Sequence, residues 1–527
     1  MYPTRLAVAI CMACAGAGCA VGPHYRPALP DAPPRFEAPV PVVQAGPDAG
    51  TALSTRAVPN VDLADLAWWR QFDDPLVAEL VQAAQLDSPT LAQSLARVLQ
   101  ARAVFQRAGA ARLPQLGLNA GATRERSVTA PGISSPATFV DGSLDASWEI
   151  DLFGARAKAA EAADARIAAR RADLRTVRVS LAAEVAATLV DYRACTASVA
   201  ILEQDLVSRQ AVSRLTGEAE KTGYMPRVDS LLSDASVASA RERLVAQRAT
   251  CDLDVKALVS LTGVAEPALR ANLANGRGGG GELPRPRAFL VETVPARALA
   301  QRPDIAAAER ELAAAAAEIN VAEAQRYPSL SLGGSIGVGR MRAGGLSGSA
   351  STWSFGPAAI SLPLFDGGRR RADAAEARGR YDEQAGAYRQ RVRDAVREIE
   401  EALVRLDAAA RRDADADLAA RQYQRYFEAG EQKFRAGASG LLDLEEARRN
   451  SLSARLTHVG VQLDRVQAWI ALYRALGGAW QDGSPAPAGA PLAALPATTS
   501  GAAPPAAALA PSVAPSGSPF ALQERLR

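Results

Sequence analysis

Residues 324–339 read AQRYPSLSLGGSIGVG, and this stretch decides the fold, because an Ala-rich helical pattern ends there and strict alternation begins. Beyond Pro328 the even positions include Leu330, Leu332, Ile336 and Val338, whereas every odd position from 329 to 339 is serine or glycine. A period of two places apolar and polar side chains on opposite faces of a strand. The stretch therefore predicts a strand with one apolar face directly after a helix.

Three further stretches have the composition of such strands, and the clearest is TFVDGSLDASWEID at 138–151. The predicted strands cover about residues 114–124, 138–151, 328–341 and 352–365, with a bulge near Pro357 where the parity changes. Each has about the 9 to 11 residues that a tilted strand needs to cross a bilayer. A half-buried sheet in a soluble protein is the alternative interpretation. It is disfavoured because no spare amphipathic helix is left to cover the apolar face.

An internal repeat organises the whole chain, with a constant offset of 214 in residue number. Pro89 matches Pro303, Pro114 matches Pro328, and Gly223 matches Gly437. The offset falls to 212 only between DLFGAR (151–156) and PLFDGGRR (363–370), which predicts a turn there because insertions concentrate in turns. We expect a first repeat at 66–263, a linker at 264–295 and a second repeat at 296–478.

Each repeat also contains a very long helix followed by a tight turn and a second long helix. Residues from about 155 to 220 contain no proline, and apolar residues recur every seven positions, as in a coiled-coil seam. At 1.5 Å per residue such a helix is about 100 Å long. The turn is TGYMPRVD at 222–229, and the second repeat has the same pattern over about 369–434 and 441–476. No apolar run approaches the roughly 20 residues of a membrane helix, so we expect any membrane crossing to use strands.

Four strands cannot close a barrel, and an open sheet edge in lipid leaves backbone groups unpaired. The sequence therefore predicts an oligomer, in which two copies supply eight strands and three copies supply twelve. The residues alone do not choose between these assemblies.

Charge and histidine content exclude other classes of function. The 60 basic and 57 acidic residues are interspersed, which is typical of solvated helix faces and not of a nucleic-acid-binding stripe. The two histidines, His24 and His458, have no catalytic neighbourhood, and there is neither a phosphate-binding loop nor a metal-ligand cluster. We expect no enzyme activity and no cofactor.

The chain begins with MYPTRLAVAICMACAGAGC, which predicts a signal peptide over residues 1–18. Small residues precede Cys19, as they do before the acylated cysteine of a lipoprotein. Ordinary cleavage that leaves Cys19 a plain thiol and acylation of Cys14 are the alternatives. Residues 19–65 are expected to form an extended, lipidated segment, and the Ala/Pro-rich residues 479–527 a disordered tail.

Several motifs in a fixed order resemble the outer-membrane factor family, the TolC-like group of efflux lipoproteins of the RND/NodT type. They are CAVGPHYRP after residue 18, LADLAWWRQFDDPLVAELVQAA at 63–84, and VPARALAQRPDIAAAERELAAAAAEINVAEAQRYPSLSL at 294–332. The resemblance implies a mainly α homotrimer with a transmembrane twelve-strand β-barrel continuing into a twelve-helix α-barrel. It also implies an exit duct for multidrug efflux in the outer membrane of a Gram-negative bacterium. Its partners would be outer-membrane lipid, a periplasmic adaptor and an inner-membrane pump.

The resemblance also assigns roles to named residues. In the family, acids six and nine residues after a glycine narrow the closed periplasmic end, which here gives Asp443 and Glu446 after Gly437, while the first repeat has Asp229 but Leu232. Candidate pairing partners for these acids are Arg227, Arg435 and Arg448. Cys19 would carry N-palmitoyl and S-diacylglycerol groups. Solvated helix ends are the alternative for the acids, and a soluble periplasmic coiled-coil adaptor or scaffold is the alternative for the whole chain.

A disulfide is expected between Cys195 and Cys251. They lie at equal distances along the chain on either side of Gly223, so they face each other in an antiparallel hairpin that turns there. Both occupy apolar heptad positions, and the periplasm permits oxidation. Two separately buried thiols are the alternative.

Overall fold

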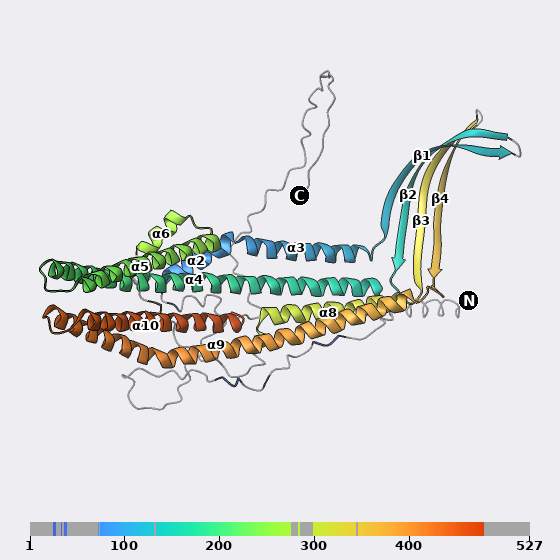
Figure 1. Ribbon diagram of the computed structural model, residues 1–527. Coiled ribbons are helices and arrows are strands. Elements are labelled where there is room, and N and C mark those ends of the chain that lie inside the picture. The colour runs from blue at the N-terminus through green and yellow to red at the C-terminus, as the bar shows by residue number, and fades with distance from the viewer. Residues whose placement is uncertain are drawn as a thin grey trace, which may run out of the picture. The chain divides into compact units, whose positions relative to one another are not determined.

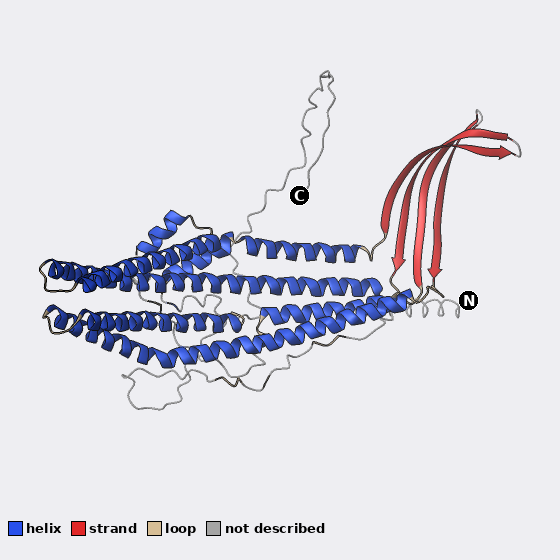
Figure 2. Cartoon of the chain, in the orientation of Figure 1, coloured by secondary structure: helices blue, strands red, loops and turns tan. Residues whose placement is uncertain are grey.

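The computed structural model describes residues 25–27, 33, 36–38, 72, 74–130, 133–275, 283–284, 299–343 and 346–478. These residues form a mainly helical chain with one four-stranded sheet (Figures 1 and 2). The elements are α2 (Pro75–Asp87), α3 (Pro89–Ala110), β1 (Gln115–Ala130), β2 (Ile133–Ile150), α4 (Ala155–Lys221), α5 (Arg227–Thr262), α6 (Glu266–Ala274), α8 (Pro303–Ala324), β3 (Ser329–Ala343), β4 (Leu346–Ser361), α9 (Arg369–Arg435) and α10 (Leu441–Ala475).

The duplication is visible in the helix bounds themselves. Helices α4 and α9 begin and end at positions separated by the same offset of 214 at both ends. Helices α3 and α8 are related by that offset at both ends as well. Adding 214 to a residue number in the first repeat therefore gives its structural counterpart in the second repeat throughout these helices.

Helices α4 and α9 each run for 67 residues without proline. The heptad seam predicted for α4 is buried, as Leu181, Cys195 and Leu202 show. Each helix ends at a glycine with positive φ, Gly223 (76°) or Gly437 (73°), a conformation that a side chain disfavours. The bond from Tyr224 N–H to the Ala219 carbonyl (2.8 Å) closes a Schellman turn, and the second repeat does the same. The chain then reverses into α5 or α10, which gives two helical hairpins.

The main hydrophobic core joins the two repeats. Leu80 of α2, Val185 and Leu189 of α4, Leu258 of α5 and Trp469 of α10 belong to one buried cluster. Full burial of one such side chain stabilises the fold by about 2 kcal/mol.

Near the strands the contact between α4 and α8 is an alanine seam, where Ala162 meets Ala314 and Ala317. Small side chains allow these two helices to approach closely. The contact between α4 and α8 thus combines this alanine seam with ion pairs from Arg166 to Glu318 (2.6 Å) and from Arg170 to Glu311 (2.9 Å).

The four strands form one antiparallel sheet in the order β1-β2-β3-β4, so β1 and β4 are its edges. The repeats meet at the β2–β3 pair, where Trp148 lies opposite Leu332 and Leu144 opposite Ile336. The bulge expected near Pro357 is confirmed by a register shift in the β3–β4 pair, between Leu332 and Gly334. The bond from Trp148 Nε1 to the Arg112 carbonyl (3.0 Å) ties the sheet to the turn that follows α3.

The apolar face of the sheet is exposed in the single chain. Its large apolar side chains include Leu118, Val140, Ile336, Val338 and Ile360. An apolar, uncovered sheet face of this size needs an apolar solvent or a partner.

The strand ends differ from the predicted ones. The strands extend further than predicted toward the turns that join β1 to β2 and β3 to β4. The sequence did not reveal these extra residues, because the apolar alternation is lost there, as in RERSVTA at the end of β1. β4 ends at Ser361 instead of near residue 365, since β3 offers it no partner beyond Ser329.

One helix of the described chain, α4, is long and apolar enough over 18 residues to cross a membrane by length and composition. That stretch has a mean hydropathy of 1.4, and 44% of it is buried inside the protein. It contains no long uninterrupted apolar run, which is why the sequence did not indicate it. Since α4 supplies much of the main core, its apolar residues are accounted for by packing between the repeats.

Short pieces of the N-terminal segment lie on the second repeat. Phe36 is buried in a cluster with Leu299, Ile305 and Ile399. The Glu400 carboxylate accepts the backbone N–H groups of residues 37 (2.8 Å) and 38 (2.7 Å). The predicted signal peptide, the Cys19 lipid site and the tail at 479–527 lie outside the described residues. Within the expected linker at 264–295 the structure has helix α6.

Candidate functional site

The acids that the resemblance singled out lie at the hairpin tips. Asp443 and Glu446 are exposed near the start of α10, and Asp229 is half-buried in the first turn of α5. The Asp443 carboxylate accepts the backbone N–H of Gly440 (3.2 Å), so it also caps its helix. Among the residues that the structure describes, none of the three acids forms a salt bridge. Two of their candidate partners, Arg435 and Arg448, pair instead with the carboxylates of residues 431 and 445.

Cys195 and Cys251 are joined by a disulfide between α4 and α5, with their Cα atoms 5.6 Å apart. Both side chains are buried. The bond links the two arms of the first hairpin. The second hairpin cannot form an equivalent bond, because the counterparts of the two cysteines are Ala409 and Arg465.

Sequence reasoning missed a buried charged network that joins the two hairpins above their tips. The guanidinium of Arg209 on α4 bonds to Asp205 (Nε to Oδ2, 2.8 Å) and reaches across to Glu445 on α10 (Nη1 to Oε2, 2.6 Å). Ser236 on α5 donates its hydroxyl to the same Glu445 oxygen (3.1 Å). Three helices therefore meet at one carboxylate.

Arg448 is the most deeply buried charge of this network, with 2% of its surface exposed. It pairs with Glu445 one turn earlier, bonds through Nη2 to the Ser208 hydroxyl of α4 (3.2 Å), and lies over the Phe427 ring of α9 (5.3 Å to the centroid). Burial lowers the pKa of the Arg448 guanidinium, the Glu445 carboxylate opposes that shift, and nearby Arg209 adds to it. A buried cation of this kind depends on its carboxylate partner.

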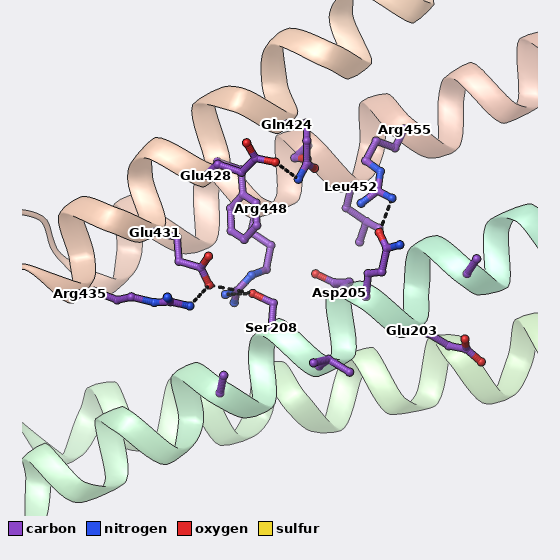
Figure 3. A pocket seen from close by; sticks show the side chains of 16 residues that line it. Glu203, Asp205, Ser208, Gln424, Glu428, Glu431, Arg435, Arg448, Leu452 and Arg455 are labelled. Atoms are coloured by element: carbon purple, nitrogen blue, oxygen red, sulfur yellow. Dashed lines mark hydrogen bonds and ion pairs between the residues drawn. The ribbon is translucent and has the colours of Figure 1, made fainter.

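Figure 3 shows Asp205, Ser208 and Arg448 among the side chains that line a cleft of about 670 Å³ between α4, α9 and α10. Arg448 points from α10 toward Ser208, and Glu431 links Ser208 (3.3 Å) to Arg435 (3.2 Å). Arg455 closes another edge of the cleft by donating to the side chain of residue 204 (2.6 Å).

The sequence held a signal for this network. Arg209 falls seven residues after Leu202 and Arg448 falls seven after Leu441, so both arginines occupy an apolar register. A charge in such a register indicates a buried ion pair, although it does not indicate the partner.

A second polar contact between the repeats lies farther from the tips. Gln467 of α10 donates to Asp191 of α4, and Asp254 of α5 lies close enough to Asp191 for their charges to interact. Burial first, and then the negative charge of Asp191, raise the pKa of Asp254 from its ordinary 3.8 to about 6. Burial also raises the pKa of Asp191, against the bond from Gln467. One carboxyl of this pair therefore changes protonation in mildly acidic solution.

These contacts hold the two helical hairpins of the chain together. Among the described residues, no group of three or more His, Cys, Asp or Glu side chains could hold a metal ion. His458 contacts Gln462 (3.0 Å) and lies 3.8 Å from the Asp413 carboxylate. Near the tips, the ion pair from Arg209 to Glu445 and the bond from Arg448 to Ser208 join α4 to α10.

The family model described as outer membrane efflux protein matches residues 80–264 and 294–478. The two matched segments are related by the same offset of 214 as the helices. Each repeat is thus recognised separately, and each match continues to the end of the second hairpin helix of its repeat.

The chain is also similar to individual proteins along most of its length. It is 32% identical over 453 residues to the pyoverdine export outer membrane protein OpmQ of Pseudomonas putida, covering 84% of this chain and 93% of the relative. It is 29% identical over 464 residues to the outer membrane protein OprJ of Pseudomonas aeruginosa, covering 85% and 93%.

Solved structures show the same fold. The outer-membrane channel OprN superposes with a TM-score of 0.73 at 29% identity, covering 87% of this chain and 99% of that one. The open state of the MtrE outer membrane channel of Neisseria gonorrhoeae gives a TM-score of 0.69 at 25% identity, covering 88% and 98%.

Replacement of Glu445 by alanine tests the buried network. Glu445→Ala leaves Arg209 and Arg448 without their shared carboxylate, so we expect a loss of about 3 to 5 kcal/mol in unfolding free energy. The matched control is Glu446→Ala, which removes an exposed acid one residue away and should change stability by less than about 0.5 kcal/mol. Thermal and urea unfolding of the purified protein measure both. Equal effects of the two variants would contradict a structural role for the network.

The raised pKa of Asp254 predicts a pH-dependent stability. The folded state holds the Asp254 proton more tightly than the unfolded state, so this group stabilises the fold below pH 3.8 and the contribution is lost as the pH rises to about 6. Asp254→Asn should therefore unfold at a higher temperature than the unchanged protein at pH 7.5, and at nearly the same temperature at pH 4. Asp252→Asn, which breaks an exposed pair with Arg270, is the control. A gain that is the same at both pH values would refute the assignment.

Proposed function

The chain belongs to the outer membrane efflux protein family, and from this premise we propose that three copies form a gated exit duct that an adaptor joins to an inner-membrane pump. The family and its relatives make the chain an outer membrane channel of an efflux system in a Gram-negative bacterium. This excludes the alternative of a soluble periplasmic adaptor. The relatives are channel proteins, and we propose that this chain likewise catalyses no reaction.

The open edges of the sheet are the observation that carries the proposal. Among the residues that the structure describes, β1 and β4 each have a neighbouring strand on one side alone, and their apolar side chains are exposed. In lipid every unpaired backbone group costs several kcal/mol, so an open four-stranded sheet is not a stable membrane structure. Pairing β4 of one copy with β1 of the next removes both edges. Three copies then give twelve strands, enough for a barrel with an open interior.

The partners follow from the kind of system to which the relatives belong. OpmQ is named for pyoverdine export, and the family is named for efflux. A duct without an energy source needs a pump in the inner membrane, and the gap between the membranes needs an adaptor. The exposed hairpin tips at Gly223 and Gly437 are the parts of the chain on which such an adaptor would act.

The tip acids are the proposed gate. Three copies would bring together rings of Asp443, Glu446 and Asp229, which repel one another unless cations or water separate them. The exposure of Asp443 and Glu446, and the lack of salt bridges to all three acids among the described residues, support this role, because a carboxylate that is already paired cannot bind a passing cation. The Arg209–Glu445–Arg448 network holds the two hairpins of a copy together just above these acids, so opening must strain or break it.

Two covalent features complete the proposal. We propose that Cys19 carries the lipid groups after removal of residues 1–18, which anchors the N-terminal segment that reaches Glu400. The Cys195–Cys251 disulfide would form in the oxidising periplasm and keep α4 and α5 moving as one unit. Its closed loop spans the tip turn, so the first hairpin is stiffer than the second.

Single-channel recording in planar bilayers tests the duct and its gate together. The unchanged protein should form pores that prefer cations, and addition of a trivalent cation to the periplasmic side should block them. Asp443→Asn with Glu446→Gln should lose most of that block and of the cation preference, because the ligands of the cation are gone. Glu242→Gln, which removes an exposed acid elsewhere on α5, is the control. Absence of any pore would refute the duct, and block that survives the double variant would refute the gate.

Intact mass measurement tests both covalent features. We expect the mature chain to begin at Cys19 with the mass of a diacylglycerol and one acyl chain added. Reduction should add two hydrogen masses, and Cys195→Ser should abolish that gain. A mature chain without lipid, or one whose mass does not change on reduction, would contradict the corresponding assignment.

A further inference from the structure

Large apolar side chains stand exposed on two helices toward the tips, outside the membrane strands. They are Leu418, Tyr423 and Tyr426 on α9, and Leu231, Val245 and Leu253 on α5. We call these six residues the apolar tip surface. Their exposed fractions run from 43% for Tyr423 to 68% for Leu253. They form two separate groups, one on α9 and one on α5, and exposed apolar groups of this kind indicate surfaces that another protein covers.

The duplication indicates what covers them. Within the chain, α4 of the first repeat packs on α10 of the second repeat, and Arg209, Glu445, Ser208 and Arg448 make that contact. The counterpart of α4 is α9 and the counterpart of α10 is α5, by the offset that relates the two repeats. In a closed ring of repeats, α9 of one copy therefore meets α5 of the next copy in the way that α4 meets α10 within one copy.

Each member of the apolar tip surface is the counterpart of a residue at the contact between α4 and α10. On α9, subtraction of 214 takes Leu418, Tyr423 and Tyr426 to Gln204, Arg209 and Val212. On α5, addition of 214 takes Leu231, Val245 and Leu253 to Glu445, Val459 and Gln467. Those counterparts bond or pack between the repeats: Arg209 with Glu445, Gln204 with Arg455, Gln467 with Asp191, Val212 with Leu441 and Leu444, and Val459 in the cluster of Ile201 and Leu202.

We infer that the apolar tip surface is the joint between neighbouring copies, in which Tyr423 of one copy packs against Leu231 of the next, where the joint inside a copy has the Arg209–Glu445 ion pair. This inference rests on the proposed ring of three copies and adds the residues that close it. No ligand other than a second copy of this chain is needed to cover the surface, because the fold already contains the matching joint.

The two kinds of joint differ in chemistry, and this has a consequence for opening. The joint inside each copy depends on buried charges, whose strength changes with protonation and with any competing charged group. At Tyr423 and Leu231 the joint between copies has apolar contact in place of that ion pair, while Asp234 and Arg241, the counterparts of Arg448 and Arg455, keep charges on α5. A charged group of a partner that reaches the tips would compete with the Arg209–Glu445 ion pair, whereas Tyr423 and Leu231 offer it no ion pair to break.

Cysteine cross-linking of the full-length protein in detergent tests the inference. Tyr423→Cys with Leu231→Cys should give covalent dimers and trimers on a non-reducing gel, with oxidant or with a short bis-maleimide. The control pair is Val207→Cys with Leu231→Cys, since Val207 is at least as exposed as Tyr423 but lies on α4, outside the joint, and it should stay monomeric on the gel. The native Cys195–Cys251 bond lies within one chain and adds no cross-link between chains.

Placing an ion pair in the joint by substitution gives a second, independent readout. Leu231→Glu alone buries a lone carboxylate in the joint and should lower the fraction of assembled protein on the order of tenfold. Adding Tyr423→Arg recreates the ion pair found inside each copy and should restore much of the assembly. If the protein assembles into trimers, but the cysteine pair gives no cross-links and Tyr423→Arg does not rescue Leu231→Glu, the proposed joint is wrong and the proposed duct stands. A chain that never assembles, even unsubstituted, would overturn the proposed function itself.

Discussion

Backbone hydrogen bonding in lipid is the constraint on which the rest of this structure depends. In the part of the chain that the structure describes, β1 and β4 have no partner on their outer sides, and a sheet with such edges cannot stay open in a solvent without donors or acceptors. The exposed apolar face of the strands places the sheet in that solvent, and the family places it in the outer membrane. The proposed oligomer would therefore be part of folding for this chain, because it supplies a partner to both edges of the described sheet.

The duplication determines how completion can occur. Helix bounds that repeat at a constant interval give each copy two nearly equivalent halves, and the contact between those halves is a template for the contact between copies. The halves are not chemically equal, however. A buried network around Glu445 joins them within a copy, whereas the counterparts of its Arg209–Glu445 pair are Tyr423 and Leu231 on the outer surfaces. In the proposed ring an ion pair inside each copy is thus replaced by an apolar pair between copies at Tyr423 and Leu231.

Much of the fold could be predicted because its signals are local. The period-two pattern at 329–338 predicted β3, and the heptads of residues 167–202 predicted the seam of α4, since both periods follow from backbone geometry alone. The family could be inferred from several motifs that occur in a fixed order along the two repeats. Strand ends were less predictable, because they are set by pairing with the neighbouring strand. β4 ends at Ser361, since its partner there is Ser329, the first residue of β3.

The charged network could not be predicted because its partners come from distant parts of the chain. Arg209 and Glu445 are 236 residues apart, and nothing in the sequence near Arg209 says which carboxylate will neutralise it. An arginine in an apolar heptad register marks only that a partner must exist. For the same reason the sequence suggested Arg448 as a partner for the tip acids, whereas its burial beside Glu445 removes it from them.

The number of chains in the detergent-purified particle tests the central claim most directly. Native mass spectrometry should find three copies, with no stable population of single chains, because only a closed ring satisfies the edges of β1 and β4. A folded single chain that stays monodisperse without detergent would contradict the account, since its strand edges and apolar sheet face would then have been satisfied within one copy.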